Sequence, residues 1–430
     1  MNLRKTYLAI FLMTLVPLSI HAGDEGGMDS VPRYSIGGSA GLSTLLGRED
    51  AGVDLVKRHS AQFYSLFFNS QSLPSDSNIY DRAWHFPSIE AGLLLADFSH
   101  VRLSRDYPSE HYMSGMGCEI AAYAAFRRDL LRNNQLRVGY ALCNGVAYST
   151  RPYNRYTNVD NEFTGSRLSV YFGLDLYGSY RFRSGVEAGL SLEFRHFSNA
   201  ALDRPNKGAN CLGVSAKMSV PVGYDAASNT TSAMNADASE TAANGHRQNR
   251  EIHRGFYLDV SGLWGGKALL DEWVYYYYNV PKDDPDCQTS HFKIRSVWGV
   301  SVAPMWRYSA RYASGIGLDY SYVTYADRIH EVDLMRGITG YETNSHVLGI
   351  SLRHEAFYRQ VSASMSFGFY LHRKMGYVSK MDEKPYYETI GIHWYPAFMH
   401  GKTYIGYDVK AHLLKADCME LRLGFHLTPR

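Results

Sequence analysis

The stretch from residue 193 to residue 210, EFRHFSNAALDRPNKGAN, contains two side chains that together can carry out acyl transfer. His196 and Ser198 are two residues apart in a run that reads as a β-strand, so they share one face of it. Serine is a weak nucleophile until a base takes its proton, and histidine is the usual base near neutral pH. A third polar group must hold the histidine in the productive tautomer. The spacing therefore predicts a serine-esterase pair that still needs an orienting partner.

Strand parity supplies a candidate for that partner. In the run 186–199 the even positions are apolar until His196 and Ser198, whereas the odd positions carry the charges. The next strand begins with Asn210 on its own apolar face, across a ten-residue loop. An antiparallel hairpin would bring the three side chains together at one membrane edge, facing lipid. Asn210 can orient His196, although an amide does not stabilise an imidazolium as a carboxylate does.

A simpler interpretation is that polar residues at a strand end mark the water interface, where they cost little. For a lone histidine or serine this interpretation is the better one. Three aligned polar groups beside a loop that contains Asn206 and Gly208 favour chemistry instead.

The rest of the chain predicts the element that must position these groups, an all-β antiparallel transmembrane barrel. Aromatic residues make up 14% of the sequence and include 34 tyrosines, and segments of alternating polarity are separated by turn-rich links. We predict sixteen strands, near 36–46, 56–68, 85–97, 113–126, 135–149, 163–181, 185–199, 210–222, 253–265, 291–309, 312–325, 345–357, 361–373, 385–398, 402–414 and 417–427. Short links alternate with long ones, as between the periplasmic and external ends of such barrels.

The chain divides into two halves. Residues 1–22 read as a signal peptide cut after Ala22, and no later run of 18 apolar residues predicts a spanning helix. A low-complexity polar linker, 224–252, separates an N-terminal half, 23–223, from a C-terminal half, 253–430. We favour one sixteen-stranded barrel because tandem barrels are uncommon; two tandem eight-stranded barrels are the alternative.

Several functional classes are not indicated. The formal net charge of +2 does not indicate nucleic-acid binding. The five scattered cysteines show neither a metal-binding spacing nor a full disulfide framework. No cofactor or metal is expected.

The stretch His-Phe-Ser-Asn, followed by Pro205-Asn206, Gly208 and Asn210, resembles the signature of the lipid A 3-O-deacylase (PagL-type) family, especially its longer members called acyloxyacyl hydrolases. The resemblance extends to 138–153, to Gly165-Ser166 and to 387–425. It implies an outer-membrane barrel that hydrolyses an ester-linked acyl chain of lipid A with a Ser-His-Glu triad at the outer-leaflet edge.

Carried over, this resemblance makes His196 the base and Ser198 the nucleophile. It also makes Asn199, Asn206 and Gly208 parts of the oxyanion loop. The departure is Asn210, which occupies the position of the family's glutamate; Asp203 is the nearby carboxylate in the loop.

The sequence thus predicts an outer-membrane serine esterase acting on lipid A or a related glycolipid in lipopolysaccharide. Two alternatives are a catalytically weak lipopolysaccharide-binding relative and a porin-like channel whose lumen carries Lys217, Lys410, Glu420 and Arg422. A homodimer is also left open.

Overall fold

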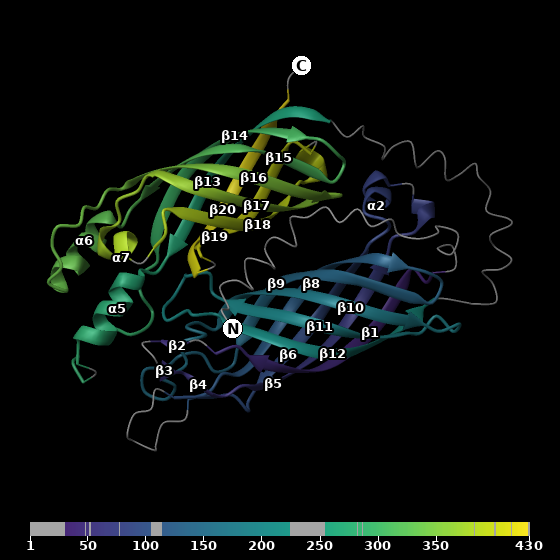
Figure 1. Ribbon diagram of the computed structural model, residues 1–430, viewed down its shortest axis with the longest axis horizontal. Helices are drawn as coiled ribbons and strands as arrows, with labels where there is room; N and C mark the ends of the chain where they lie inside the picture. Colours follow the sequence, from purple (N-terminus) through teal and green to yellow (C-terminus); the bar gives the residue numbers. More distant parts are fainter. Residues whose placement is uncertain are drawn as a thin grey trace.

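The chain folds into two closed antiparallel β-barrels of eight strands each, as a computed structural model shows (Figure 1). The structure describes residues 31–47, 49–50, 53–76, 78–104, 114–223, 254–281, 283–285, 287–381, 383–399, 401–413 and 415–428. The predicted signal peptide and the predicted linker 224–252 lie outside these residues.

The first barrel consists of β1 (Tyr34–Leu45), β5 (Ser60–Gln71), β6 (Ser88–Phe98), β8 (Gly117–Arg132), β9 (Leu136–Ser149), β10 (Leu168–Arg181), β11 (Glu187–Ser198) and β12 (Ala209–Val222). The second consists of β13 (Gly255–Lys267), β14 (Arg295–Arg307), β15 (Tyr312–Val323), β16 (His346–Tyr358), β17 (Val361–His372), β18 (Tyr386–Trp394), β19 (Thr403–His412) and β20 (Lys415–Leu427). Each overlaps one of the sixteen predicted strands.

The expectation of one sixteen-stranded barrel is wrong, and the tandem alternative is correct. Strand β1 pairs with β12 along its whole length, from Tyr34 opposite Val222 to Leu45 opposite Cys211. Strand β13 pairs with β20 from Leu258 opposite Leu427 to Gly266 opposite Met419. No unpaired strand edge can face lipid, so each half satisfies its backbone by closing on itself. Alternating polarity reports which face of a strand is apolar and does not report which distant strand closes the sheet.

The connections between strands differ in length at the two ends of the barrels. One end, called here the loop end, carries the long links. It includes the helices α5 (Leu270–Asn279), α6 (Ala326–Met335) and α7 (Gly376–Met381) and the short strands β2 (Glu49–Asp50), β3 (Val53–Asp54), β4 (Val56–Arg58) and β7 (Arg102–Leu103). These elements gather at the left of Figure 1. The opposite end, the turn end, carries mostly tight turns, together with η2 (Pro74–Asp76), α2 (Ile79–Ala83) and η3 (Ala397–Met399).

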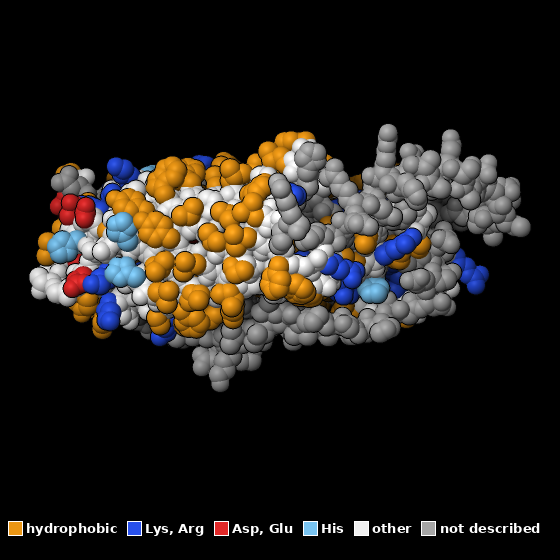
Figure 2. Space-filling model, turned by 90° about the horizontal axis from the view of Figure 1, so that it is seen from above, with side chains coloured by type: hydrophobic (Ala, Val, Ile, Leu, Met, Phe, Trp, Pro, Cys, Tyr) orange, Lys and Arg blue, Asp and Glu red, His pale blue; other side chains and the backbone are white. Residues whose placement is uncertain are grey.

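The outward faces of the strands carry the apolar side chains. Leu190 on β11 and Leu352 on β16, for example, are 71% and 62% exposed. Figure 2 shows hydrophobic side chains covering the middle of the second barrel, with charged and histidine side chains gathered toward the loop end. An apolar outer band with polar ends is typical of a barrel that spans a membrane. Within the described residues, no helix is both long and apolar enough to cross a bilayer.

Charged side chains that pair with one another fill the interiors. In the first barrel, Glu90 binds Arg127 at 3.1 Å and also Lys217. In the second, Asp408 binds Arg422 at 2.6 Å, and Arg353 bridges two aspartates. A cavity of about 40 Å³ remains within this second network, which is room for a few water molecules. Eight strands enclose an interior just wide enough for side chains to fill.

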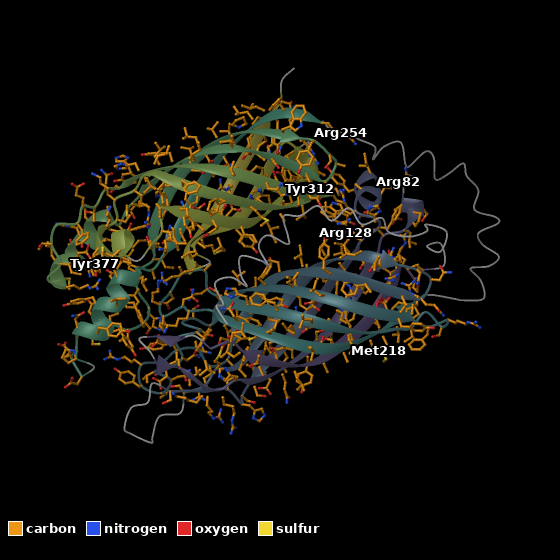
Figure 3. All side chains as sticks on the ribbon, viewed as in Figure 1. Arg82, Arg128, Met218, Arg254, Tyr312 and Tyr377 are labelled. Carbon is orange, nitrogen blue, oxygen red and sulfur yellow. The ribbon has the colours of Figure 1, made fainter. Side chains whose placement is uncertain are left out.

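The two barrels contact each other at the turn end through the segment that contains α2. Trp84 donates its indole N–H to the carbonyl of Phe357 at 2.7 Å, and its ring packs edge-on against Tyr312. Buried Asp81 pairs with Arg359 at 2.7 Å. Figure 3 shows Tyr312 on the second barrel facing Arg128 on the first, beside α2; the Arg128 guanidinium lies over Trp84.

The filled interiors predict that the protein does not conduct solutes. Purified protein reconstituted in planar bilayers is expected to give no stepwise conductance of the size produced by wide porins, because ion pairs close both lumens. A sixteen-stranded porin in the same bilayers is the positive control. Regular open-channel steps that follow protein addition would contradict the assignment of two plugged barrels.

Candidate active site

The hairpin of β11 and β12 places His196 directly opposite Asn210 at the loop end of the first barrel. The imidazole Nδ1 lies 2.8 Å from the amide oxygen of Asn210. An amide oxygen only accepts hydrogen bonds, so the proton of the neutral ring resides on Nδ1 and donates to Asn210. This leaves Nε2 with its lone pair free, which is the state that a general base requires.

Ser198 lies two residues further along the same outward face, with its hydroxyl held by the following loop. The side-chain amide of Asn206 donates to Ser198 Oγ at 3.0 Å, and the backbone N–H of Ala200 donates to it at 3.2 Å. Two residues of strand span about 6.6 Å. Among the described residues, the hydroxyl binds this loop and no hydrogen bond joins it to His196.

The loop 199–208 is shaped by its asparagines and by one glycine. Asn199 braces it by donating to Ser166 Oγ at 3.1 Å and to the carbonyl of Asp203 at 3.2 Å. Gly208 has a φ of +70°, and a Cβ there would lie 2.8 Å from Cε1 of His196. A side chain at this position would therefore strain the backbone and displace the imidazole.

Asp203 does not take the place of the missing carboxylate. One of its oxygens accepts from the N–H of Arg204 at 2.7 Å, and the other lies 3.5 Å from His291 of the second barrel. Burial raises the pKa of Asp203 above its ordinary value. The group that contacts His196 is Asn210, as strand parity predicts.

The surroundings of the pair are apolar. Phe172 of β10 lies opposite His196, and Val170 lies opposite Ser198. His196 and Asn210 are only partly exposed. The two charged residues on either side of Phe194, Glu193 and Arg195, point into the lumen and pair with each other. His196 is thus partly exposed on the outward face of the barrel. Ser198 is on the same face but is only 8% exposed, and its hydroxyl is held by the loop.

A second serine, histidine and acid cluster lies inside the second barrel. Ser364 Oγ is 3.2 Å from Nε2 of His393, but the same nitrogen is 3.1 Å from Asp408. Since the aspartate competes for the nitrogen that would have to take the serine proton, this cluster belongs to the ion-pair network that fills the lumen. A membrane lipid would also have no route to it.

The described residues contain one group with the ligand types of a metal site, Glu383, His412 and Asp417. Arg373 pairs with Glu383, and Lys267 pairs with Asp417. Two protein cations already neutralise these carboxylates, so the cluster is an ion-pair network at the loop end of the second barrel.

Two protein-family models match the chain. Residues 143–219 match the model described as lipid A 3-O-deacylase (PagL), and residues 273–429 match the model described as acyloxyacyl hydrolase, C-terminal domain. Each half of the chain thus contains a segment similar to the lipid A 3-O-deacylases or the acyloxyacyl hydrolases. The first match contains His196, Ser198 and Asn210, and the second covers most of the second barrel. These matches and the barrel architecture together indicate an outer-membrane protein.

Two solved structures are among those similar to this chain. One is the outer membrane enzyme PagL, at 15% identity and a TM-score of 0.24, covering 44% of this chain and 99% of that one. The other is an outer membrane channel from Pseudomonas putida F1, at 9% identity and a TM-score of 0.21, covering 96% of this chain and 99% of that one. No curated protein matches.

Sequence reasoning missed three parts of the site. These are the backbone N–H of Ala200, the contact of Asn199 with Ser166, and the contacts of the loop with the second barrel. Backbone donors carry no signature in the sequence. The spacing of asparagines in the loop is the signal that points to Asn206.

The His196–Asn210 contact predicts the tautomer of the imidazole. Nitrogen NMR of the protein in detergent micelles is expected to show His196 protonated on Nδ1, and Asn210→Leu is expected to lose that preference because the acceptor is gone. A wild-type ring protonated on Nε2 at neutral pH would contradict the assigned role of Asn210.

Proposed function

We propose that this protein is an outer-membrane serine esterase that removes an ester-linked acyl chain from lipid A or a related glycolipid. The observation that carries the proposal is the His196–Asn210 hydrogen bond beside Ser198, at the end of the outward face of β11. The deacylase family match over the same hairpin supports the substrate class.

In the proposed reaction, Ser198 turns its hydroxyl from Asn206 toward Nε2 of His196. His196 takes the proton as Oγ attacks the ester carbonyl, and then gives it to the departing sugar hydroxyl as the acyl-enzyme forms. Water, activated by the same imidazole, releases the fatty acid and restores Ser198. Each step moves one proton and needs no metal or cofactor.

The loop supplies donors for the oxyanion of the tetrahedral intermediate. The amide of Asn206 and the N–H of Ala200 both point at Ser198 Oγ. When the hydroxyl turns away, these two donors are released next to the reacting carbon. Asn199 and Gly208 act indirectly, the first by bracing the loop and the second by leaving room for the imidazole.

The position of the pair suits a substrate that is itself a membrane lipid. The acyl chains of a glycolipid in the outer leaflet lie against the outward face of β10, β11 and β12, so the scissile ester comes to the strand end where His196 and Ser198 lie. A site inside the lumen would require the lipid to leave the membrane.

The alternative function is that of a relative that binds lipopolysaccharide without activity. This alternative rests on Asn210, which occupies the position where the family has glutamate. An amide fixes the tautomer but provides no charge to stabilise the imidazolium. We therefore expect a slower enzyme than a carboxylate would give. A homodimer stays a prediction.

Ser198→Ala tests the nucleophile. Lipid A from cells that express the wild type is expected to lose one ester-linked acyl chain in mass spectra. Ser198→Ala is expected to lower the rate by about 1,000-fold or more, because it removes the nucleophile that forms the acyl-enzyme.

Ser364→Ala in the lumen of the second barrel is the matched control and should deacylate like the wild type. Identical acylation patterns for the wild type and Ser198→Ala, in a host whose lipid A carries the susceptible ester, would contradict the proposed function.

Asn210→Asp is expected to raise kcat by about tenfold, because a charge-assisted hydrogen bond to the imidazolium is roughly twice as strong as a neutral one. Asn210→Leu should lower kcat below that of the wild type. Initial rates of fatty-acid release from lipid A vesicles at neutral pH measure both effects. A rate for Asn210→Asp that is no higher than that of Asn210→Leu would show that Asn210 does not orient the base.

A further inference from the structure

The far side of the active-site loop lies against the second barrel. Ala268, the first residue after β13, donates its N–H to the carbonyl of Ala201 at 2.8 Å. The carbonyl of Ala268 in turn accepts from Nε of Arg204 at 3.1 Å. Both alanines are completely buried. One backbone position of the second barrel therefore holds the loop at two points.

The contact is continuous along the loop from Ala201 to Arg204. A Cβ on Gly266 of β13 would lie 3.7 Å from Cδ2 of Leu202, an ordinary packing distance. Asp203 accepts from the N–H of Phe292 at 3.4 Å. Ala201, Asp203 and Arg204 thus hydrogen-bond to the other barrel, and Leu202 lies next to Gly266.

Arg204 is the positively charged residue of this contact. It is 3% exposed. Burial lowers the pKa of its guanidinium, and the carboxylates of Asp417, Asp271 and Glu383 in the second barrel partly offset this effect. A buried guanidinium is tolerated only where acceptors and opposite charges surround it. The second barrel provides both kinds of partner, a carbonyl and an acidic group.

The chain leads from Arg204 directly to the reacting hydroxyl. Pro205 follows, and its carbonyl packs so closely against Gly165 of the neighbouring loop that a Cβ there would lie 2.0 Å from it. Asn206 comes next and donates to Ser198 Oγ. Two residues span about 7 Å at most. A displacement of Arg204 would therefore also displace Asn206.

We propose that the second barrel is a positioning element of the esterase site and that Arg204 is the residue through which it acts. This inference rests on the proposed function, since it assigns a role in that reaction. Arg204 touches neither the ester nor the reacting atoms, so it is a positioning residue. It holds Asn206 where the amide meets the oxyanion.

The test compares Arg204→Gln and Arg204→Lys with a control at the other end of the interface. Arg359→Gln removes an inter-barrel ion pair at the turn end, while Tyr358 still donates to Asp81 at 2.8 Å. All four full-length proteins are purified in detergent, and their folding is checked by resistance to SDS without heating. Two quantities are measured: hydrogen exchange of residues 199–208, and kcat and KM on lipid A vesicles.

Arg204→Gln is expected to exchange faster in the loop and to lower kcat by about tenfold to a hundredfold, with little change in KM, because a small misplacement of a catalytic group is costly. Arg204→Lys keeps the charge and is expected to recover part of kcat. Arg359→Gln should stay within about twofold of the wild type, since distant sites act independently.

Unchanged loop exchange, unchanged kcat or an equal loss in Arg359→Gln would each overturn the inference. If Arg204→Gln does not fold, the ordering of kcat among the wild type, Arg204→Lys and Arg359→Gln decides the question. A wild type that releases no fatty acid, together with faster exchange in Arg204→Gln, would refute the proposed function while leaving the anchoring of the loop supported.

Discussion

The hydrogen bond between His196 and Asn210 is the interaction on which the candidate site depends. It exists because β11 and β12 are paired in a register that sets these two residues opposite each other, and because both strands present their even positions outward. A shift of one residue would turn His196 into the lumen, where Arg195 and Glu193 now pair with each other. The register is fixed in turn by the apolar band that must face lipid.

Closure of each half into its own barrel decides what the second half can do. A single wide barrel would have paired β12 with β13 and left a lumen open to solutes. Two narrow barrels have filled interiors, so the chemistry is confined to their surfaces and to the contacts between them. The barrels meet at both ends, through Trp84 and Asp81 at the turn end and through Ala268 at the loop end. The loop-end contact lies directly behind the residues that hold Ser198.

Much of this arrangement follows from the sequence, because it depends on local alternation. The sixteen strands and the shared face of His196, Ser198 and Asn210 come from a period of two, which any strand pairing preserves. The strand pairs that close each barrel could not be predicted in this way. Strands β1 and β12 are distant in sequence, and their alternation fits one sixteen-stranded barrel as well as two eight-stranded ones. The helix α5 was also missed: four consecutive tyrosines have modest helix propensity, and the helix is held by packing of Trp273 against Tyr277. The role of Arg204 could not be predicted from the sequence, since its partners belong to the other barrel.

The central claim is that Ser198 forms the covalent intermediate at the lipid-facing end of β11. Rapid acid quenching of the enzyme during turnover of lipid A, followed by peptide mass spectrometry, measures this most directly. The account predicts one acyl group on the peptide that contains Ser198, and none in the same peptide of His196→Ala. An enzyme that turns over with no acyl group on this peptide, or with the acyl group on another residue, would contradict it.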